Sequence, residues 1–205
     1  MKFLSHDEAV AALWRGEVVA VPTDTVYGVA ARLLDATAVT RLFEVKSRPR
    51  DVALPVLIES AHAVATLDVE WSERAQALAE RFWPGALTIV VGAGPATAAL
   101  VGATTTLGLR VPHHEELAAI IAECGPLAVT SANEHGEAPC TSADDVLVVQ
   151  WAAPVAGVLD GGRSDGAVSS VVELTSQGWY LRRSGAVSVG EIETVIGPES
   201  ATDDQ

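Results

Sequence analysis

The spacing of apolar residues changes repeatedly along the chain, and each spacing predicts either a strand or a helix. Short apolar runs such as Val18–Val21 and Ala86–Val91 predict buried strands. Apolar residues three and four positions apart, as in Ser72–Trp83, predict amphipathic helices. We expect helices near residues 5–16, 36–46, 61–67, 72–83, 115–124, 142–151 and 188–196, and strands near 18–21, 29–31, 53–58, 86–91, 106–111, 127–130, 155–159, 169–174 and 179–182.

Capping signals support several of these helix boundaries. Ser5 and Glu8 have the spacing of a capping box, and Gly16 suits the position that follows a helix. Ser142 and Asp145 have the same spacing at the start of the helix near 142–151. These signals predict where the helices begin more firmly than where they end.

The order of the elements predicts the fold class. Strands and helices alternate, and the last third is rich in strands, which favours a mixed sheet over a purely parallel one. The Gly92–Pro95 segment is predicted to be a loop, because its G-x-G lacks the third glycine of a dinucleotide-binding turn. We therefore expect a single α/β domain over residues 1–198, with a mixed parallel and antiparallel sheet flanked by helices, and a disordered tail at 199–205.

Composition bounds the class of protein. Apolar residues make up 49% of the 205 residues, which indicates a folded globular chain. No apolar run approaches the roughly 20 residues that span a bilayer, and the N-terminus lacks the apolar stretch of a signal peptide. Cys124 and Cys140 have no metal-ligand spacing and are predicted to be free thiols. We therefore expect a cytoplasmic protein with no membrane partner.

Charge singles out one segment. The net charge is −14, yet Lys46, Arg48 and Arg50 lie within five residues, where the helix near 36–46 ends before Pro49. A group of cations beside the hydroxyl-rich Thr23–Thr25 segment indicates a phosphate site. The alternative is that these cations only interact with the helix C-terminus and with solvent. The acidic remainder argues against polynucleotide binding, which depends on neutralised phosphates.

Five motifs occur in one order along almost the whole chain. They are PTDTVYG at 22–28 followed by KSRP at 46–49, TLGLRVP at 106–112, TSANEHGEAP at 130–139, VSSVVEL at 168–174 and LRRSG at 181–185. Together they resemble the YrdC/TsaC family of threonylcarbamoyl-AMP synthases. The resemblance implies a single twisted mixed sheet around a deep cavity. It also implies synthesis of threonylcarbamoyl-AMP and pyrophosphate from L-threonine, bicarbonate or CO₂, and ATP, for the threonylcarbamoyladenosine modification of tRNA.

The resemblance also implies roles for individual residues. Lys46 and Arg48 match a K-x-R pair that holds the ATP phosphates, which is the implied catalytic role. The implied ATP-binding set is Lys46, Arg48, Arg50, Thr106, Ser131, Asn133, Pro139 and Arg183, and the implied threonine-binding set is Thr23, Tyr27, Arg110, Thr130 and Ser169. No protein residue is assigned to a metal, and Mg²⁺ is expected to arrive with ATP.

Strand alternation adds expectations about orientation. Arg110 follows Thr106 by four residues, so both side chains should share one face of a strand. An arginine on an apolar strand needs a partner, because an unpaired buried charge is costly. The resemblance supplies the threonine carboxylate, and the alternative is an ion pair with Asp24 or Glu173.

Three further places in the chain need comparison with the family pattern. Arg182 and Arg183 should face opposite ways, and the spacing to Gly185 favours Arg183 as the one in the cavity. Asp51–Ala53 stands where relatives often carry another lysine, which leaves a positive charge missing or shifts its role to Arg50. His135 replaces a hydroxyl residue common in relatives, and we expect it to face solvent.

Two other functions are alternatives. One is a carbamoyl-handling nucleotide-binding domain related to hydrogenase maturation proteins, which share K-x-R and S-A-N motifs within much longer chains. The other is a non-catalytic nucleotide- or RNA-binding module, which the acidic composition disfavours. For the synthase, the expected partners are ATP, L-threonine, bicarbonate and a downstream tRNA threonylcarbamoyl transferase complex, without tight binding of tRNA.

Overall fold

The computed structural model describes residues 1–50, 52–134 and 136–200. Its strands are β1 (Phe3–Leu4), β2 (Val19–Val21), β3 (Gly28–Arg32), β4 (Val56–Leu57), β5 (Leu87–Gly92), β6 (Thr106–Arg110), β7 (Leu127–Ser131), β8 (Val158–Leu159), β9 (Ser170–Thr175) and β10 (Gly178–Arg183). Its α-helices are α1 (His6–Trp14), α2 (Ala36–Val45), α3 (Glu73–Phe82), α4 (Pro95–Leu100), α5 (Glu115–Cys124), α6 (Ala143–Leu147) and α7 (Val189–Ile196), and η1 (Ala61–Thr66) is a 3₁₀-helix.

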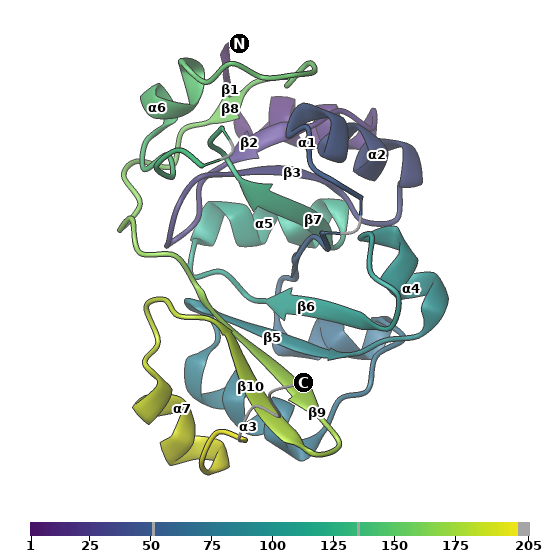
Figure 1. The fold of residues 1–205 in the computed structure, drawn as a ribbon. Helices are drawn as coiled ribbons and strands as arrows, with labels where there is room; N and C mark the ends of the chain where they lie inside the picture. The colour runs from purple at the N-terminus through teal and green to yellow at the C-terminus, as the bar shows by residue number, and fades with distance from the viewer. Residues whose placement is uncertain (51, 135, 201–205) are drawn as a thin grey trace.

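Within the described residues, the strands form one sheet in the order β1-β8-β2-β3-β7-β4-β6-β5-β9-β10 (Figure 1). Neighbours β2 and β3, β3 and β7, β7 and β4, β6 and β5, and β9 and β10 are antiparallel. The pairs β1 and β8, β2 and β8, β4 and β6, and β5 and β9 are parallel. The mixed α/β architecture predicted from the order of elements is confirmed.

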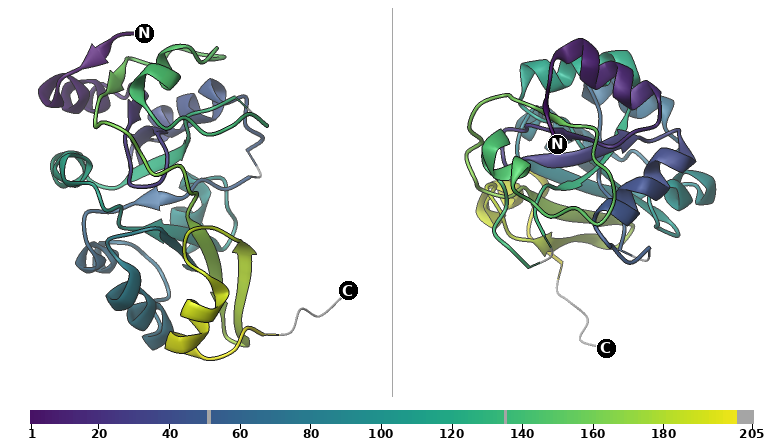
Figure 2. Two further views of the ribbon diagram at one scale, coloured as in Figure 1. Left: turned by 90° about the vertical axis from the view of Figure 1, so that its left-hand side faces the viewer. Right: turned by 90° about the horizontal axis from the view of Figure 1, so that it is seen from above.

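Helices cover both faces of the sheet, which explains the unbroken apolar runs in its central strands. Val19 and Val21 pack with α1 and α5 in one hydrophobic cluster, whereas Ala20 between them packs with α2 in the other. Figure 2 shows α1 and α2 separated by the sheet when the molecule is viewed from above. Adjacent residues of one strand therefore enter different layers of the core.

Most predicted boundaries hold to within a few residues. Ser5 caps α1 with the expected capping box, and α5 spans the predicted 115–124. The predicted strand at 53–58 shortens to β4, because the Leu54 amide bonds the Val101 carbonyl outside the sheet. The helix predicted over 142–151 ends at Leu147. After it, the Ala152 amide bonds back to the Val45 carbonyl.

Three elements differ from the sequence predictions. The loop expected at 92–95 leads directly into α4, with Pro95 in its first turn, where a missing N–H costs nothing. Strand β1 was not expected. Residues 199 and 200 of the predicted tail are bonded to β10, because the Leu181 amide bonds the Glu199 carboxylate and the Ser200 amide bonds the Trp179 carbonyl. The rest of that tail, 201–205, lies outside the described residues, as do Asp51 and His135.

Candidate active site

The turn between β2 and β3 is organised by the Thr23 hydroxyl. Thr23 Oγ1 accepts hydrogen bonds from the amides of Thr25 (3.1 Å) and Val26 (3.2 Å), and donates to the Val26 carbonyl at 2.7 Å. Threonine is favoured here because its hydroxyl replaces a backbone partner in the turn. The hydroxyl oxygens of Thr23 and Thr25 also lie 2.9 Å apart, so the Thr23 hydroxyl holds the turn together.

Arg110 lies buried against this turn, 6% exposed. Its Nε donates to the Gly85 carbonyl (2.8 Å), Nη1 to Thr25 Oγ1 (2.9 Å) and Nη2 to Asp24 Oδ1 (2.5 Å). Of the two carboxylates that the sequence offered as alternatives, Asp24 is therefore the ion-pair partner of Arg110. A guanidinium has five N–H groups, so two of those on Arg110 have no partner among the described residues.

A second guanidinium lies close to the first. Arg183 donates from Nε to the Ser169 carbonyl (2.9 Å) and from Nη2 to Ser169 Oγ (2.8 Å). Arg182 turns the other way and pairs with Glu173, as strand alternation predicts. Burial lowers the pKa of the Arg110 guanidinium, Asp24 opposes the shift, and the positive charge of Arg183 lowers the pKa further.

We call Asp24, Thr25, Arg110, Ser169 and Arg183 the arginine cluster. Among the described residues Arg183 pairs with no carboxylate, so the two guanidinium groups share only Asp24 as a counter-charge. Both stay protonated, because the pKa of arginine is far above neutrality. The cluster therefore carries an excess positive charge and can bind an anion.

A separate lysine cluster comprises Lys46, Ser131 and Asn133. Lys46 ends α2, and its Nζ donates to the Asn133 carbonyl and, at 3.3 Å, to Asn133 Oδ1. Ser131 Oγ donates to the same Oδ1 at 2.6 Å. Burial, followed by the nearby charge of Arg48, lowers the pKa of Lys46 to about 8.

The two arginines that follow Lys46 lie differently. Arg48 donates to the carbonyls of Val52 (2.8 Å) and Ala53 (2.9 Å), so its fork holds the loop before β4. Its other three N–H groups have no partner among the described residues. Arg50 is exposed, with its guanidinium 5.8 Å from the Phe43 ring centroid. Arg48 thus lies near Lys46, whereas the described contacts do not bring Arg50 into the cluster.

The end of the turn connects the two clusters. The Tyr27 carbonyl accepts from the Ala132 amide at 2.8 Å, and Gly28 pairs with Ser131 across β3 and β7. A Cβ at Gly28 would lie 2.7 Å from a methyl group of Val129, so the close pairing requires glycine. One short segment, residues 23–28, therefore contacts both clusters.

The remaining predicted residues are more dispersed. The Tyr27 hydroxyl donates to the Gly162 carbonyl (2.7 Å), so it anchors the loop before β9, and burial raises its pKa. Thr106 begins β6, at the opposite end of the strand from Arg110. Thr130 is buried on β7, and Pro139 precedes Cys140, whose carbonyl accepts from the Tyr27 amide.

Sequence reasoning missed three contributors. Asp24 was considered only as an ion-pair partner, and Thr25 was given no role although its hydroxyl contacts Arg110. Thr88 on β5 was read as part of an apolar strand, yet its Oγ1 lies 3.1 Å from Ser169 Oγ. The PTDT motif was a sufficient signal for the first two, whereas nothing in the sequence pattern marks Thr88.

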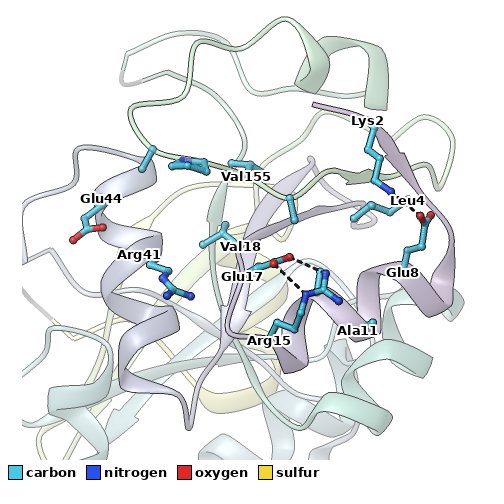
Figure 3. Close-up of a pocket in the computed structure, with 14 residues that line it drawn as sticks. Lys2, Leu4, Glu8, Ala11, Arg15, Glu17, Val18, Arg41, Glu44 and Val155 are labelled. Carbon is cyan, nitrogen blue, oxygen red and sulfur yellow. Dashed lines mark hydrogen bonds and ion pairs between the residues drawn. The ribbon is translucent and has the colours of Figure 1, made fainter.

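A large cavity lies away from these clusters. It has a volume of about 960 Å³ and lies between α1, α2 and residues 153–156 (Figure 3). Most of the charged side chains that line it already have a partner. Lys2 pairs with Glu8, Arg15 pairs with Glu17, and Arg41 donates to the Gly16 carbonyl. None of the predicted site residues lines it, so the cavity carries no functional assignment.

The described part of the chain holds neither a cluster of metal ligands nor a membrane-spanning helix. Within residues 1–50, 52–134 and 136–200, no three His, Cys, Asp or Glu side chains gather as metal ligands. Over the same residues, no helix is long and apolar enough to cross a bilayer.

Comparisons with known proteins place the chain in a family. A family model described as "Telomere recombination", which covers Sua5, YciO and YrdC, matches residues 11–185. The chain belongs to the Sua5/YciO/YrdC family. A Mycobacterium tuberculosis relative is 38% identical over 196 residues, covering 95% of this chain and 90% of the relative. A Pyrococcus abyssi protein named threonylcarbamoyl-AMP synthase is 40% identical over 185 residues, covering 89% of this chain and 54% of the relative.

Solved structures give the same answer for this Sua5/YciO/YrdC domain. P. abyssi Sua5 complexed with L-threonine matches with a TM-score of 0.86 and 36% identity, over 97% of this chain and 60% of that one. The full-length hydrogenase-maturation protein HypF, in a phosphate- and nucleotide-bound form, matches with a TM-score of 0.67. At 19% identity, HypF shows a shared fold alone.

Proposed function

We propose that this protein is an L-threonylcarbamoyladenylate synthase, a nucleotidyltransferase that makes threonylcarbamoyl-AMP and pyrophosphate from L-threonine, bicarbonate or CO₂, and ATP. The observation that carries this proposal is the pair of neighbouring guanidinium groups, Arg110 and Arg183, of which only Arg110 pairs with a carboxylate, Asp24, among the described residues. Such a cluster suits the carboxylate of an amino acid. The family relatives named threonylcarbamoyl-AMP synthase and the threonine-bound Sua5 support the same substrate.

The reaction joins three substrates in two steps. The threonine amine adds to CO₂, or to bicarbonate with loss of water, and gives up a proton to form a carbamate. A carbamate oxygen then attacks the α-phosphorus of ATP, and the bond to the β-phosphate oxygen breaks to release pyrophosphate. Neither step needs a covalent bond to the protein, so the protein acts by positioning substrates and stabilising charge.

Residue roles follow the two clusters. The two free N–H groups of Arg110 take the threonine carboxylate, with Ser169 and Thr130 on the threonine side. Lys46 and the free N–H groups of Arg48 take the ATP phosphates, with Ser131 and Asn133 beside them. Arg183, first expected to contact the nucleotide, is assigned to the arginine cluster, because both of its hydrogen bonds go to Ser169.

Roles for Thr106, Pro139 and Arg50 in binding ATP stay proposals without contact support. Thr23 is assigned to holding the turn and Tyr27 to anchoring the loop before β9, instead of contacting threonine, because their hydroxyl groups bond the Val26 and Gly162 carbonyls. Mg²⁺ is proposed to arrive as part of the nucleotide substrate. The product is proposed to pass to a tRNA threonylcarbamoyl transferase complex, because a chain of net charge −14 is poorly suited to hold tRNA itself.

The test is threonine-dependent release of pyrophosphate from ATP and bicarbonate, with the product identified by mass spectrometry. Lys46→Ala and Arg48→Ala should each lower kcat/KM by about 30- to 1,000-fold, which corresponds to roughly 2–4 kcal/mol of transition-state stabilisation. Arg182→Ala is the matched control, because that exposed cation pairs with Glu173 away from both clusters. Near-normal release by both cluster variants would contradict the assignment, and binding of ATP with no release of pyrophosphate would favour a non-catalytic nucleotide-binding module.

A further inference from the structure

Thr88 carries a buried hydroxyl beside the arginine cluster and has no assigned role. It lies on β5, 4% exposed, between the apolar residues Leu87 and Ile89. Within the described residues, the sole hydrogen-bond partner of its Oγ1 is Ser169 Oγ, at 3.1 Å. A β-branched residue in a buried strand needs no function, but a valine would fill this place without a polar group to satisfy.

Backbone hydrogen bonds link the segment that leads into Thr88 to Arg110 and to Ser170, the neighbour of the Ser169 that Arg183 contacts. Arg110 Nε donates to the Gly85 carbonyl, and the Ser170 amide donates to the Ala86 carbonyl at 3.0 Å. A Cβ built on Gly108 would lie 3.4 Å from the Thr88 methyl group, so Thr88 and Gly108 share one face of the sheet. Arg110 follows Gly108 by two residues and lies on that face as well.

Hydrogen-bond capacity at Ser169 gives Thr88 a specific effect. A serine hydroxyl has one proton and two acceptor sites. Arg183 Nη2 already donates to Ser169 Oγ at 2.8 Å and uses one acceptor site. If the Thr88 hydroxyl donates as well, both acceptor sites are used and the Ser169 proton must point to another acceptor. Hydrogen bonds that form a chain also strengthen one another, because each polarises the next.

We propose that Thr88 is a positioning residue that donates to Ser169 and thereby directs the Ser169 hydroxyl proton at an oxygen of the amino-acid substrate. The proposal rests on the proposed function, since it assumes that L-threonine binds at the arginine cluster. Thr88 does not touch the substrate, and acts only through Ser169. Its effect should therefore fall on amino-acid binding and leave ATP binding unchanged.

Three variants of Thr88 and Ser169 separate this role from simple packing. Thr88→Val keeps the shape and removes the hydroxyl, Thr88→Ser keeps the hydroxyl and removes the methyl group, and Ser169→Ala removes the proposed intermediary. Thr88→Val should raise the KM for L-threonine by about 3- to 10-fold, the range of one hydrogen bond. The KM for ATP should change less than about twofold, and Thr88→Ser should restore the KM for threonine. Thr175→Val is the matched control at the exposed far end of β9.

A double-mutant cycle gives the decisive result. If Thr88 acts only through Ser169, adding Thr88→Val to Ser169→Ala should change the KM for threonine by less than about twofold. Independent, multiplying effects would overturn the proposal, and so would a Thr88→Val variant with the KM of the wild type. Calorimetric titration with L-threonine supplies a readout that needs no turnover. If the wild-type protein is active but Thr88→Val leaves the KM for threonine unchanged, this inference alone fails. If the wild-type protein neither binds nor uses threonine, the proposed function fails as well.

Discussion

The ion pair between Asp24 and Arg110 should contribute measurably to stability, and Asp24→Asn tests it. The two side chains are 16% and 7% exposed, so neither charge is well solvated. Asparagine keeps the size and one oxygen acceptor but removes the counter-charge, which leaves a buried guanidinium without compensation. Breaking a buried pair by removing one partner costs about 3–5 kcal/mol, and the retained acceptor places the expected loss near the lower value.

This loss converts to a shift in melting temperature. In a chain of 205 residues, 1 kcal/mol corresponds to about 2–4 °C, so Asp24→Asn should lower Tm by about 6–12 °C. Glu17→Gln is the matched control, because it removes the same charge from an ion pair whose partners are 40% and 59% exposed. Exposed pairs contribute about 0–1 kcal/mol, so the control should lower Tm by at most about 4 °C.

Thermal unfolding followed by circular dichroism, with urea unfolding as a second measure, compares the two variants. A third variant, Asp24→Asn with Arg110→Met, separates charge imbalance from lost packing. Removing both charges should recover part of the loss, because well-packed apolar replacements of buried ion pairs are often neutral or stabilising. The reasoning is refuted if Asp24→Asn is no less stable than Glu17→Gln, or if the double variant is less stable than Asp24→Asn.

Two further predictions concern the lysine cluster and tRNA. Because Lys46 has a pKa of about 8, its cationic fraction falls from about 0.9 at pH 7 to about 0.1 at pH 9, so kcat/KM for ATP should fall about tenfold over that range. Lys46→Arg keeps its charge over this range. The ratio of wild-type to variant kcat/KM should therefore show the fall, because titration of the substrates affects both proteins equally and cancels. A ratio that does not change with pH would contradict the role of Lys46. Filter binding at physiological ionic strength should detect no tight tRNA complex, and salt-sensitive nanomolar binding would argue against transfer of the product to a separate enzyme.

The fold was largely predictable, because long apolar periods and capping boxes are local signals. α1 and α5 follow from Ser5 and from the periodicity at 115–124 alone. The elements that were missed depend on distant partners. β1 exists through two residue pairs with β8, and β4 is shorter than predicted because the Leu54 amide before it bonds Val101. Such short strands have no periodicity that sequence reasoning can measure.

The candidate site was predictable in its residues more than in its contacts. The motif residues Arg110, Ser169 and Arg183 were all selected, but the hydrogen bonds that join Arg183 to Ser169 were not predicted. Thr23 was selected as a ligand contact, although its proton closes the turn. A sequence pattern shows that a hydroxyl is present, but the direction of its proton depends on neighbours brought together by folding.

The charge of each cluster accounts for the proposed division of substrates between them. The arginine cluster has two guanidinium groups against Asp24, an excess of one, which matches the single negative charge of an amino-acid carboxylate. Lys46 and Arg48 lie near each other, form no ion pair within the described residues and match a polyphosphate better. The turn at 23–28 contacts the first cluster through Asp24, which bonds Arg110, and the second through Gly28, which pairs with Ser131, so one short segment connects the two. A substitution that loosens this turn should therefore impair the joining of the two substrates more than the binding of either one.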